Sequence, residues 1–230
     1  MYKGKTVAAI LLAAGSGARF GAGFNKAFVT LGETPLYTWA LRSLCDHPNI
    51  DRIFLVMQKK EFSALTDGCC YGYDENSITL VEGGQTRRES VRNALLATDA
   101  DIVLIQDAAR PFLKREYIDG CLDAMDRYPG ATVAAPSTDT IKISREDQTV
   151  DHTTDRSRTW QTQTPQCFDR QVLLEANARY DGSIEATDDC MLLERTGFPV
   201  ALIPGSAENI KITRPLDLKL AELLIADGRM

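Results

Sequence analysis

The sequence predicts an α/β fold, a Rossmann-like and mostly parallel sheet flanked by helices, with a protruding β-arm. Short aliphatic runs alternate with amphipathic segments along most of the 230 residues, as in sheets with helical crossovers. The 44% apolar and 25% charged content suffices for one α/β core. One polar, Thr-rich stretch over residues 137–164 interrupts the alternation. We therefore expect a single domain over residues 1–230 with the arm, residues 137–160, inserted in it.

The alternating segments give the expected elements in order. The strands are expected at residues 7–12, 53–57, 78–81, 102–105, 132–135 and 200–203. The helices are expected at residues 35–45, 90–97, 115–127, 169–178, 187–195 and 215–226. Thr34 is the expected cap of the first helix, with Pro35 in its first turn. Such a sheet places its ligand crevice at the carboxyl ends of the strands.

The arm is predicted from residues 137–160, where short β-prone pieces occur at residues 140–143 and 149–153. A long structureless loop is uncommon inside a compact domain, so we favour a β-ribbon. A mobile surface loop is the alternative. A ribbon exposes unpaired strand edges that commonly dock on a partner, which predicts a homodimer through the arm.

Charge and cysteine content exclude several classes of protein. The net charge of −6 disfavours a nucleic-acid partner, which needs a basic face. The apolar run at residues 7–14 is too short for a membrane span and lacks a signal-peptide cleavage pattern. The six cysteines have no C-x-x-C pair or regular spacing, which favours a reduced cytoplasmic location without zinc or disulfides. They are Cys45, Cys69, Cys70, Cys121, Cys167 and Cys190.

A glycine-rich segment follows the first expected strand. Residues 12–19 read Leu-Ala-Ala-Gly-Ser-Gly-Ala-Arg, and Lys26 follows seven residues later. Small residues let backbone N–H groups approach phosphate oxygens, while Arg19 and Lys26 can neutralise the negative charge. An ordinary strand-to-helix turn explains the glycines alone. The two cations favour a nucleoside triphosphate site.

The same segment argues against two common nucleotide-binding fingerprints. A dinucleotide fingerprint needs its third glycine where Phe20 stands, and a P-loop needs Gly-Lys-Ser/Thr after four spacer residues. Neither pattern is met. An NAD(P)-dependent oxidoreductase of doubly wound fold is therefore disfavoured.

A second glycine signal, in residues 82–90, follows the third expected strand and reads Glu-Gly-Gly-Gln-Thr-Arg-Arg-Glu-Ser. Backbone groups near Gly83 and Gly84 are suited to contact a base edge, and Ser90 is suited to cap a helix or contact the base. The alternative is a turn followed by a solvated charge cluster that includes Arg88 and Glu89.

Asp107 follows the fourth expected strand and opens the sequence Asp-Ala-Ala-Arg-Pro over residues 107–111. A carboxylate at the carboxyl end of a strand is well placed to hold Mg²⁺ against triphosphate oxygens. We predict Asp107 as the metal ligand. An internal ion pair between Asp107 and Arg110 is the alternative, and the two are compatible.

Lys211 is expected on a short strand late in the chain, with Thr213 as the cap of the closing helix. If that strand lies at the crevice, Lys211 adds a cation, and Glu208 or Asn209 could complete the metal shell. A surface edge strand with an exposed lysine is the alternative.

The sequence disfavours hydrolytic mechanisms that use a catalytic histidine. His47 and His152 are the only histidines, neither has a suitable partner in the sequence, and no G-x-S-x-G elbow is present. The chemistry is therefore expected to be positional and electrostatic.

The motifs together resemble those of the 2-C-methyl-D-erythritol 4-phosphate cytidylyltransferases over almost the whole chain. They comprise residues 12–19, 83–87, 107–111, 153–156 (Thr-Thr-Asp-Arg), 164–166 (Thr-Pro-Gln) and 208–213 (Glu-Asn-Ile-Lys-Ile-Thr). The resemblance implies a nucleotidyltransferase fold of GT-A-like type. It also implies Mg²⁺-dependent coupling of CTP to 2-C-methyl-D-erythritol 4-phosphate in isoprenoid precursor synthesis, with release of pyrophosphate, by a homodimer.

The resemblance further implies roles for individual residues. Residues around the nucleotide would be Ala13, Ala14, Gly15, Gly17, Gly83, Gly84 and Ser90. Catalytic cations would be Arg19, Lys26 and Lys211, which stabilise charge near the α-phosphorus. Residues around the acceptor would be Asp107, Arg110 and Thr187, with Thr140 and Arg156 supplied by the neighbouring subunit.

Two departures from the family pattern concern the nucleotide loop. The family commonly has Pro-Lys-Gln where this chain has Asn25, Lys26 and Ala27, so we expect a loop less rigidly preset and lacking one polar contact. Gln85 stands where an acidic residue is frequent, which leaves a cytosine contact there open.

Three alternatives remain at this stage. The first is a ribitol 5-phosphate cytidylyltransferase, and the second a transferase acting on a sugar 1-phosphate with another nucleotide. A non-catalytic nucleotide-binding module of the same fold is the third; loss of Asp107 or Lys26 would favour it, and both are present.

Overall fold

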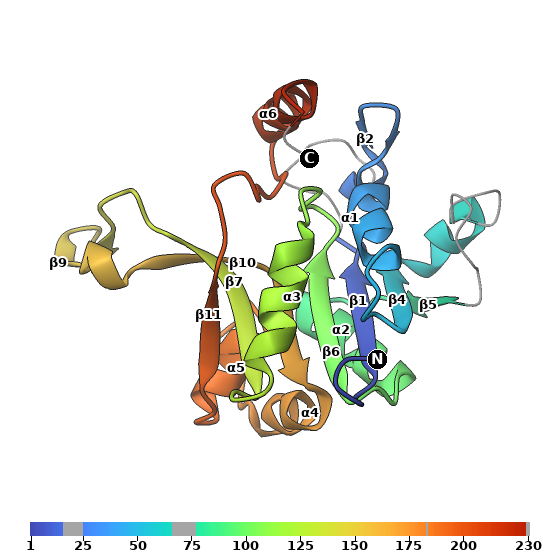
Figure 1. The fold of residues 1–230 in the computed structure, drawn as a ribbon. Coiled ribbons are helices and arrows are strands. Elements are labelled where there is room, and N and C mark those ends of the chain that lie inside the picture. The colour runs from blue at the N-terminus through green and yellow to red at the C-terminus, as the bar shows by residue number, and fades with distance from the viewer. Residues whose placement is uncertain (16–24, 66–76, 183, 229–230) are drawn as a thin grey trace.

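The computed structural model describes residues 1–15, 25–65, 77–182 and 184–228, and its centre is a seven-stranded sheet (Figure 1). In spatial order the strands are β11 (Val200–Pro204), β7 (Gly130–Pro136), β10 (Trp160–Asp169), β6 (Ile102–Asp107), β1 (Val7–Leu12), β4 (Arg52–Met57) and β5 (Ile78–Glu82). The α-helices are α1 (Leu36–Cys45), α2 (Arg87–Ala97), α3 (Arg115–Ala124), α4 (Arg170–Arg179), α5 (Cys190–Arg195) and α6 (Pro215–Ala226). Short 3-10 helices are η2 (Lys26–Phe28), η3 (Lys59–Leu65) and η5 (Arg156–Arg158).

The sheet is parallel except for β10, which pairs antiparallel with both β6 and β7. The predicted mostly parallel sheet and its six strands are confirmed. The sequence analysis missed β10 because its middle is polar. Gln163, Thr164 and Gln166 are at most 7% exposed, and tertiary hydrogen bonds make their burial tolerable.

Both faces of the sheet are buried under helices, which explains the unbroken aliphatic strands. Helices α1 and α3 cover one face, shown in front in Figure 1, with Leu44 and Ile118 in the core beneath them. Helices α2, α4 and α5 cover the other face, where Val91 and Leu173 are buried. Helix α6 packs on a smaller cluster that includes Ile212, beside the β2 (Thr30–Leu31) and β3 (Thr34–Pro35) hairpin.

The predicted β-arm is present between β7 and β10 and protrudes from one side of the sheet (Figure 1). It is a two-stranded ribbon of β8 (Lys142–Ser144) and β9 (Val150–Thr153), followed by η5. Its apolar side chains Ile143 and Val150 are 43% and 54% exposed.

Three expected caps differ in the structure. Helix α1 begins after Pro35 without a side-chain cap, and the Thr34 hydroxyl is buried without a partner. Helix α2 begins three residues before Ser90, because Thr86 and Glu89 form a capping box. At α6 the cap position is Arg214, while Thr213 bonds to Asp217 in the first turn.

Among the described residues, the helices are too short or too polar for any of them to cross a membrane.

Replacing Leu104, fully buried in β6, tests the contribution of the central sheet. We expect Leu104→Ala to lower the free energy of unfolding by about 2–5 kcal/mol, because it removes apolar contacts and leaves a cavity. Leu216→Ala, at a position 73% exposed, is the matched control and should change it by less than about 0.5 kcal/mol. Urea unfolding measures both, and equal losses would contradict this placement of the core.

Candidate functional site

The carboxyl ends of four parallel strands, β1, β4, β5 and β6, meet at one edge of the sheet, where an open cavity of about 640 Å³ lies. The predicted site residues that line it are Ala13, Ala14, Gly15, Lys26, Gly84, Ser90, Asp107 and Lys211. Gly17 and Arg19 lie outside the described residues. Segments separated by almost 200 residues in sequence therefore form one pocket.

Gly83 does not line the cavity but allows its wall to close. A Cβ atom at Gly83 would lie 2.5 Å from the Cβ of Ala14, so only glycine fits between the two loops. The Gly83 amide donates to the carbonyl of Met57 at 2.8 Å, which fixes the turn after β5. The next amide, of Gly84, donates to Ser90 Oγ at 3.0 Å.

Asp107 ends β6 and forms an ion pair with Lys211, whose Nζ lies 2.5 Å from Asp107 Oδ2. Burial alone would raise the pKa of Asp107, but the positive charges of Arg87 and Lys211 outweigh burial and lower this pKa to about 2. The carboxylate is therefore ionised at neutral pH and faces a cationic cavity.

Lys211 lies on an irregular segment, not on the predicted strand. The backbone N–H of its neighbour Ile212 donates to the carbonyl of Ala109 at 2.8 Å, and the Ile212 side chain is fully buried. This anchor holds the late segment against the turn after β6. The sequence could not locate Lys211 because that anchor joins residues far apart in the chain.

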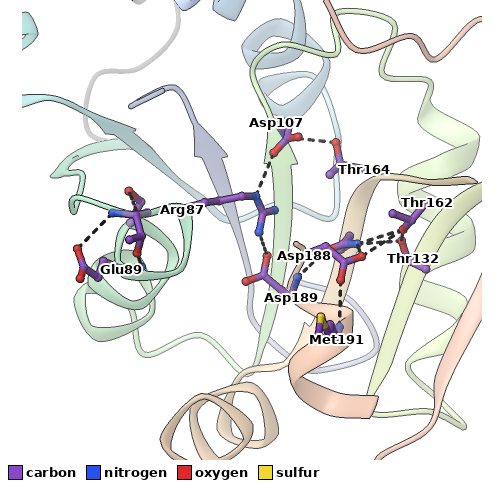
Figure 2. Close-up of polar contacts among 12 residues, drawn as sticks. Arg87, Glu89, Asp107, Thr132, Thr162, Thr164, Asp188, Asp189 and Met191 are labelled. Carbon is purple, nitrogen blue, oxygen red and sulfur yellow. Dashed lines mark hydrogen bonds and ion pairs between the residues drawn. The ribbon is translucent and has the colours of Figure 1, made fainter. Parts of the chain in front are cut away.

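Arg87 is a site residue that the sequence analysis did not assign. Its Nε lies 3.6 Å from Asp107 Oδ1, and its Nη1 donates to Asp189 Oδ2 at 2.6 Å, so one guanidinium bridges two carboxylates (Figure 2). Two adjacent arginines at a helix start are a weak signal. The distant carboxylates of Asp107 and Asp189 distinguish Arg87 from Arg88, which bonds to the carbonyl of Asn177 instead.

Asp189 is 1% exposed and belongs to a buried polar network beside the site. Burial raises the pKa of Asp189, and the charge of Arg87 opposes that rise. Its backbone amide donates to Gln166 Oε1 at 3.3 Å, and Gln166 Nε2 donates to Asp188 Oδ2 at 2.9 Å. Asp188 also accepts from the amide of Met191, as Figure 2 shows, so β10 and α5 are tied together at this point.

Arg110 does not form the ion pair with Asp107 that the sequence analysis gave as an alternative. Its guanidinium donates to the carbonyls of Asn209 at 2.6 Å and Thr162 at 3.3 Å. Burial lowers the pKa of Arg110, and the charge of Asp107 only partly opposes this. Arg110 does not line the described part of the cavity, although the backbone of its turn supports Asp107 through the N–H of Arg110 and the carbonyl of Asp107.

Glu208 and Asn209 bond to partners other than Asp107, and their suggested place in a metal shell stays a prediction. Glu208 pairs with Lys114 at 3.1 Å. The Asn209 side chain is fully buried and donates to Gln163 and to the carbonyl of Thr164. Within the described ranges, no three His, Cys, Asp or Glu side chains form a metal-binding cluster.

Besides Arg110, three predicted acceptor residues do not line the described cavity of this chain. Thr140 and Arg156 are exposed on the arm, and Thr187 is exposed before α5. Both histidines are also elsewhere: His47 pairs with Asp119 at 3.2 Å, and His152 lies on the arm. The described cavity therefore brings together most of the residues predicted for the nucleotide but, of those predicted for the acceptor, only Asp107.

The segment around Lys26, expected to be less rigidly preset without proline, has side-chain hydrogen bonds at Asn25. The Asn25 side chain is buried and caps η2 by accepting from the amide of Ala27 at 3.0 Å. Ala27 is itself buried in the core. Side-chain hydrogen bonds thus supply local order at this position without proline.

The donor set fits Mg²⁺ only as part of a metal–triphosphate complex. Asp107 offers a hard oxygen ligand at the cavity, and Mg²⁺ commonly binds through one or two carboxylates with phosphates and water completing its shell. The cations Lys26, Arg87 and Lys211 suit the excess negative charge of a triphosphate. Among the described residues, a metal ion without phosphate would have too few protein ligands at this cavity.

A mostly parallel sheet with a cationic, glycine-lined cavity and one carboxylate at its strand ends defines an α/β nucleotidyltransferase. The family model for 2-C-methyl-D-erythritol 4-phosphate cytidylyltransferase matches residues 7–227. The chain belongs to this family.

Relatives and solved structures agree with this assignment. The chain is 40% identical to the 2-C-methyl-D-erythritol 4-phosphate cytidylyltransferase of Clostridium acetobutylicum over 94% of this chain and 96% of the relative. It is also 40% identical to that of Syntrophotalea carbinolica over 96% of each chain. The crystal structure of 4-diphosphocytidyl-2C-methyl-D-erythritol synthase from Anaerococcus prevotii is similar with a TM-score of 0.88, at 30% identity over 97% of each chain.

Removing Arg87 tests the bridge between the two carboxylates. We expect Arg87→Met to lower the free energy of unfolding by about 3 kcal/mol at pH 8. This value is at the low end of the losses measured when one partner of a buried ion pair is removed, because the arginine side chain is 30% exposed. Asp189 would then be a buried carboxyl without its cation, so its folded pKa would lie above the unfolded value. Such a group favours the folded state at low pH and loses that contribution as the pH rises through the raised pKa.

The loss should therefore be smaller at pH 5 than at pH 8, measured by urea unfolding at both. Arg88→Met is the matched control, because its guanidinium contacts Asn177 and the ring of Tyr180 instead of a carboxylate. Its effect should be independent of pH. A pH-independent loss for Arg87→Met would contradict the bridge.

Proposed function

We propose that the cavity couples CTP to 2-C-methyl-D-erythritol 4-phosphate and releases pyrophosphate. The observation that carries this proposal is the ionised Asp107 held between Lys211 and Arg87 at the strand ends, on a cavity that Lys26 also lines. Membership of the family supplies the substrates.

The reaction needs no protein nucleophile. An oxygen of the acceptor phosphate forms a bond to the α-phosphorus of CTP, the bond from that phosphorus to the bridging oxygen breaks, and pyrophosphate leaves with the electron pair. Lys26 and Lys211 place positive charge beside the phosphoryl oxygens where negative charge develops. In the absence of substrate Lys211 is paired with Asp107, so substrate phosphate competes with that carboxylate for the ammonium group.

Cytosine recognition is assigned to the turn after β5. The Ser90 hydroxyl donates to the carbonyl of Thr86 at 3.0 Å and accepts from the amide of Gly84. Its remaining capacity is as an acceptor. An acceptor there favours the exocyclic amine of cytosine over the carbonyl oxygen of uracil.

Mg²⁺ belongs to this proposal as a partner of the triphosphate. Asp107 would hold it, and the bound ion would neutralise part of the triphosphate charge. Arg87, which also lines the cavity, holds the Asp107 carboxylate in place through its ion pair.

A homodimer through the arm would complete the acceptor end. Thr140 and Arg156 are exposed on a ribbon that extends away from its own cavity. A guanidinium such as that of Arg156 can bind a phosphate through two hydrogen bonds. We assign these two residues to the partner's site, and Arg110 and Thr187 to the acceptor side of the same site.

A cytoplasmic location is also part of the proposal. Among the described residues, Cys121, Cys167 and Cys190 are buried and form no disulfide, which suits a reducing compartment.

Pyrophosphate release with purified protein tests the activity. We expect release with CTP, 2-C-methyl-D-erythritol 4-phosphate and Mg²⁺, and loss of it with EDTA. ATP, UTP and GTP serve as nucleotide controls, and ribitol 5-phosphate as the acceptor control. Preference for ribitol 5-phosphate would move the protein to that activity with the same mechanism, and no release with any pair would remove the proposed function.

The shared site predicts complementation between two inactive chains. Lys26→Ala and Arg156→Ala should each lose turnover by several orders of magnitude. A heterodimer of the two, isolated with different affinity tags, holds one complete site and should recover about half of the wild-type turnover per dimer.

The matched control is a heterodimer of Lys26→Ala with Lys211→Ala. Both residues line the same cavity, so each site of this heterodimer keeps one defect and no recovery is expected. Equal activity in the two heterodimers would contradict a site completed by the partner's arm.

A further inference from the structure

Asn25 precedes the proposed catalytic Lys26 and is 7% exposed, although it is polar. Its side-chain amide donates to the carbonyl of Ala13 at 2.6 Å and to Glu61 Oε2 at 2.9 Å. Its Oδ1 accepts from the amide of Ala27 at 3.0 Å. Every side-chain hydrogen of Asn25 thus has an acceptor, and its oxygen has a donor.

Glu61, on η3, is the second buried polar residue of this cluster and is 9% exposed. Glu61 Oε2, which accepts from Asn25, also accepts from the backbone N–H of Gln58 at 3.1 Å. The Gln58 side chain in turn donates to the carbonyl of Ala14 at 3.3 Å. The cluster therefore ties together three segments: the end of β1, the end of β4 and the start of η2.

The cluster surrounds the backbone on which Lys26 is carried. Lys26 is the first residue of η2, and Asn25 caps that helix with φ −65° and ψ 121°. On the other side, Ala27 is 5% exposed and packs in the main core. The backbone of Lys26 is thus held from both sides, while the residue lines the cavity.

Asn25 stands where the Pro-Lys-Gln pattern has proline, and its backbone φ angle is compatible with proline. A φ of −65° is the value that the proline ring imposes. Here the same backbone conformation is maintained by hydrogen bonds to Glu61 and Ala13. A buried amide and a buried carboxylate are costly unless their partners are present, so the cluster is expected to act as a unit.

We infer that Asn25 and Glu61 form a positioning pair that fixes Lys26 for triphosphate binding and turnover. The inference rests on the proposed role of Lys26. Asn25 lines the cavity beside Lys26 and Glu61 does not, so an effect that the two residues share is expected to pass through the segment that carries Lys26.

Four variants test the pair. Asn25→Ala removes all three hydrogen bonds and should lower kcat about ten- to hundredfold, the effect of displacing a catalytic group by about 1 Å. Glu61→Ala should have a similar effect. Glu61→Gln keeps an acceptor for Asn25 and should stay close to wild type, and Asn25→Pro imposes the same φ and should recover most of the turnover lost in Asn25→Ala. Asn49→Ala, at the opposite edge of the sheet before β4, is the matched control and should retain wild-type kcat.

A thermodynamic cycle on CTP affinity separates positioning from a general structural role. Calorimetry should show weaker CTP binding for Asn25→Ala than for wild type, and no further weakening when Asn25→Ala is added to Lys26→Ala. Equal weakening in both backgrounds would overturn the inference, as would wild-type kcat and CTP affinity in Asn25→Ala. Failure of Asn25→Pro to exceed Asn25→Ala would also overturn it.

Amide hydrogen exchange at Ala27 gives a readout that needs no substrate. Protection of this amide should be lost in Asn25→Ala and kept in Asn49→Ala, and unchanged protection in both would overturn the inference. If wild-type protein binds CTP but releases no pyrophosphate, the proposed function fails. The thermodynamic cycle on CTP affinity and the hydrogen exchange at Ala27 would still decide the role of Asn25.

Discussion

The charge on Asp107 is the constraint on which the rest of the site depends. A carboxylate with an exposed fraction of 8% at the end of a central strand is costly unless cations compensate it. Lys211 and Arg87 supply that compensation from a late irregular segment and from the first turn of α2. The fold must therefore bring three distant segments to one point, beside the cavity that Lys26 also lines.

The polar interior of β10 follows from the same requirement. Arg87 balances two carboxylates, and the second of them, Asp189, is held by Gln166 through the backbone. An antiparallel strand with polar side chains thus occupies the centre of an otherwise apolar parallel sheet. Strand β7 leads the chain into the arm and β10 leads it out, so the strand that holds the Arg87 network also determines where the arm joins the sheet. Stability and site geometry are coupled through this strand.

Much of the fold could be predicted from local sequence, because aliphatic strands buried on both faces and amphipathic helices between them have clear signals. Helix starts were less certain. Thr86 is the cap of α2 instead of Ser90, and Thr34 caps nothing, since several polar residues near each start compete for the role. The strand β10 was missed because it contains the polar residues Gln163 and Gln166. Their burial is possible because they form tertiary hydrogen bonds, which local sequence does not reveal.

The sequence by itself determined the alternation of strands and helices and the arm, and it predicted Lys26 and Asp107 as residues of a phosphate site, because residue type and order carry these signals. Only the tertiary structure decided which charges meet. It joined Arg87 to Asp189, sent Arg110 and Glu208 to other partners, and enclosed Asn25 beside Glu61. Ion pairs and buried hydrogen bonds depend on distances between segments far apart in the chain, and local pattern contains no information on those distances.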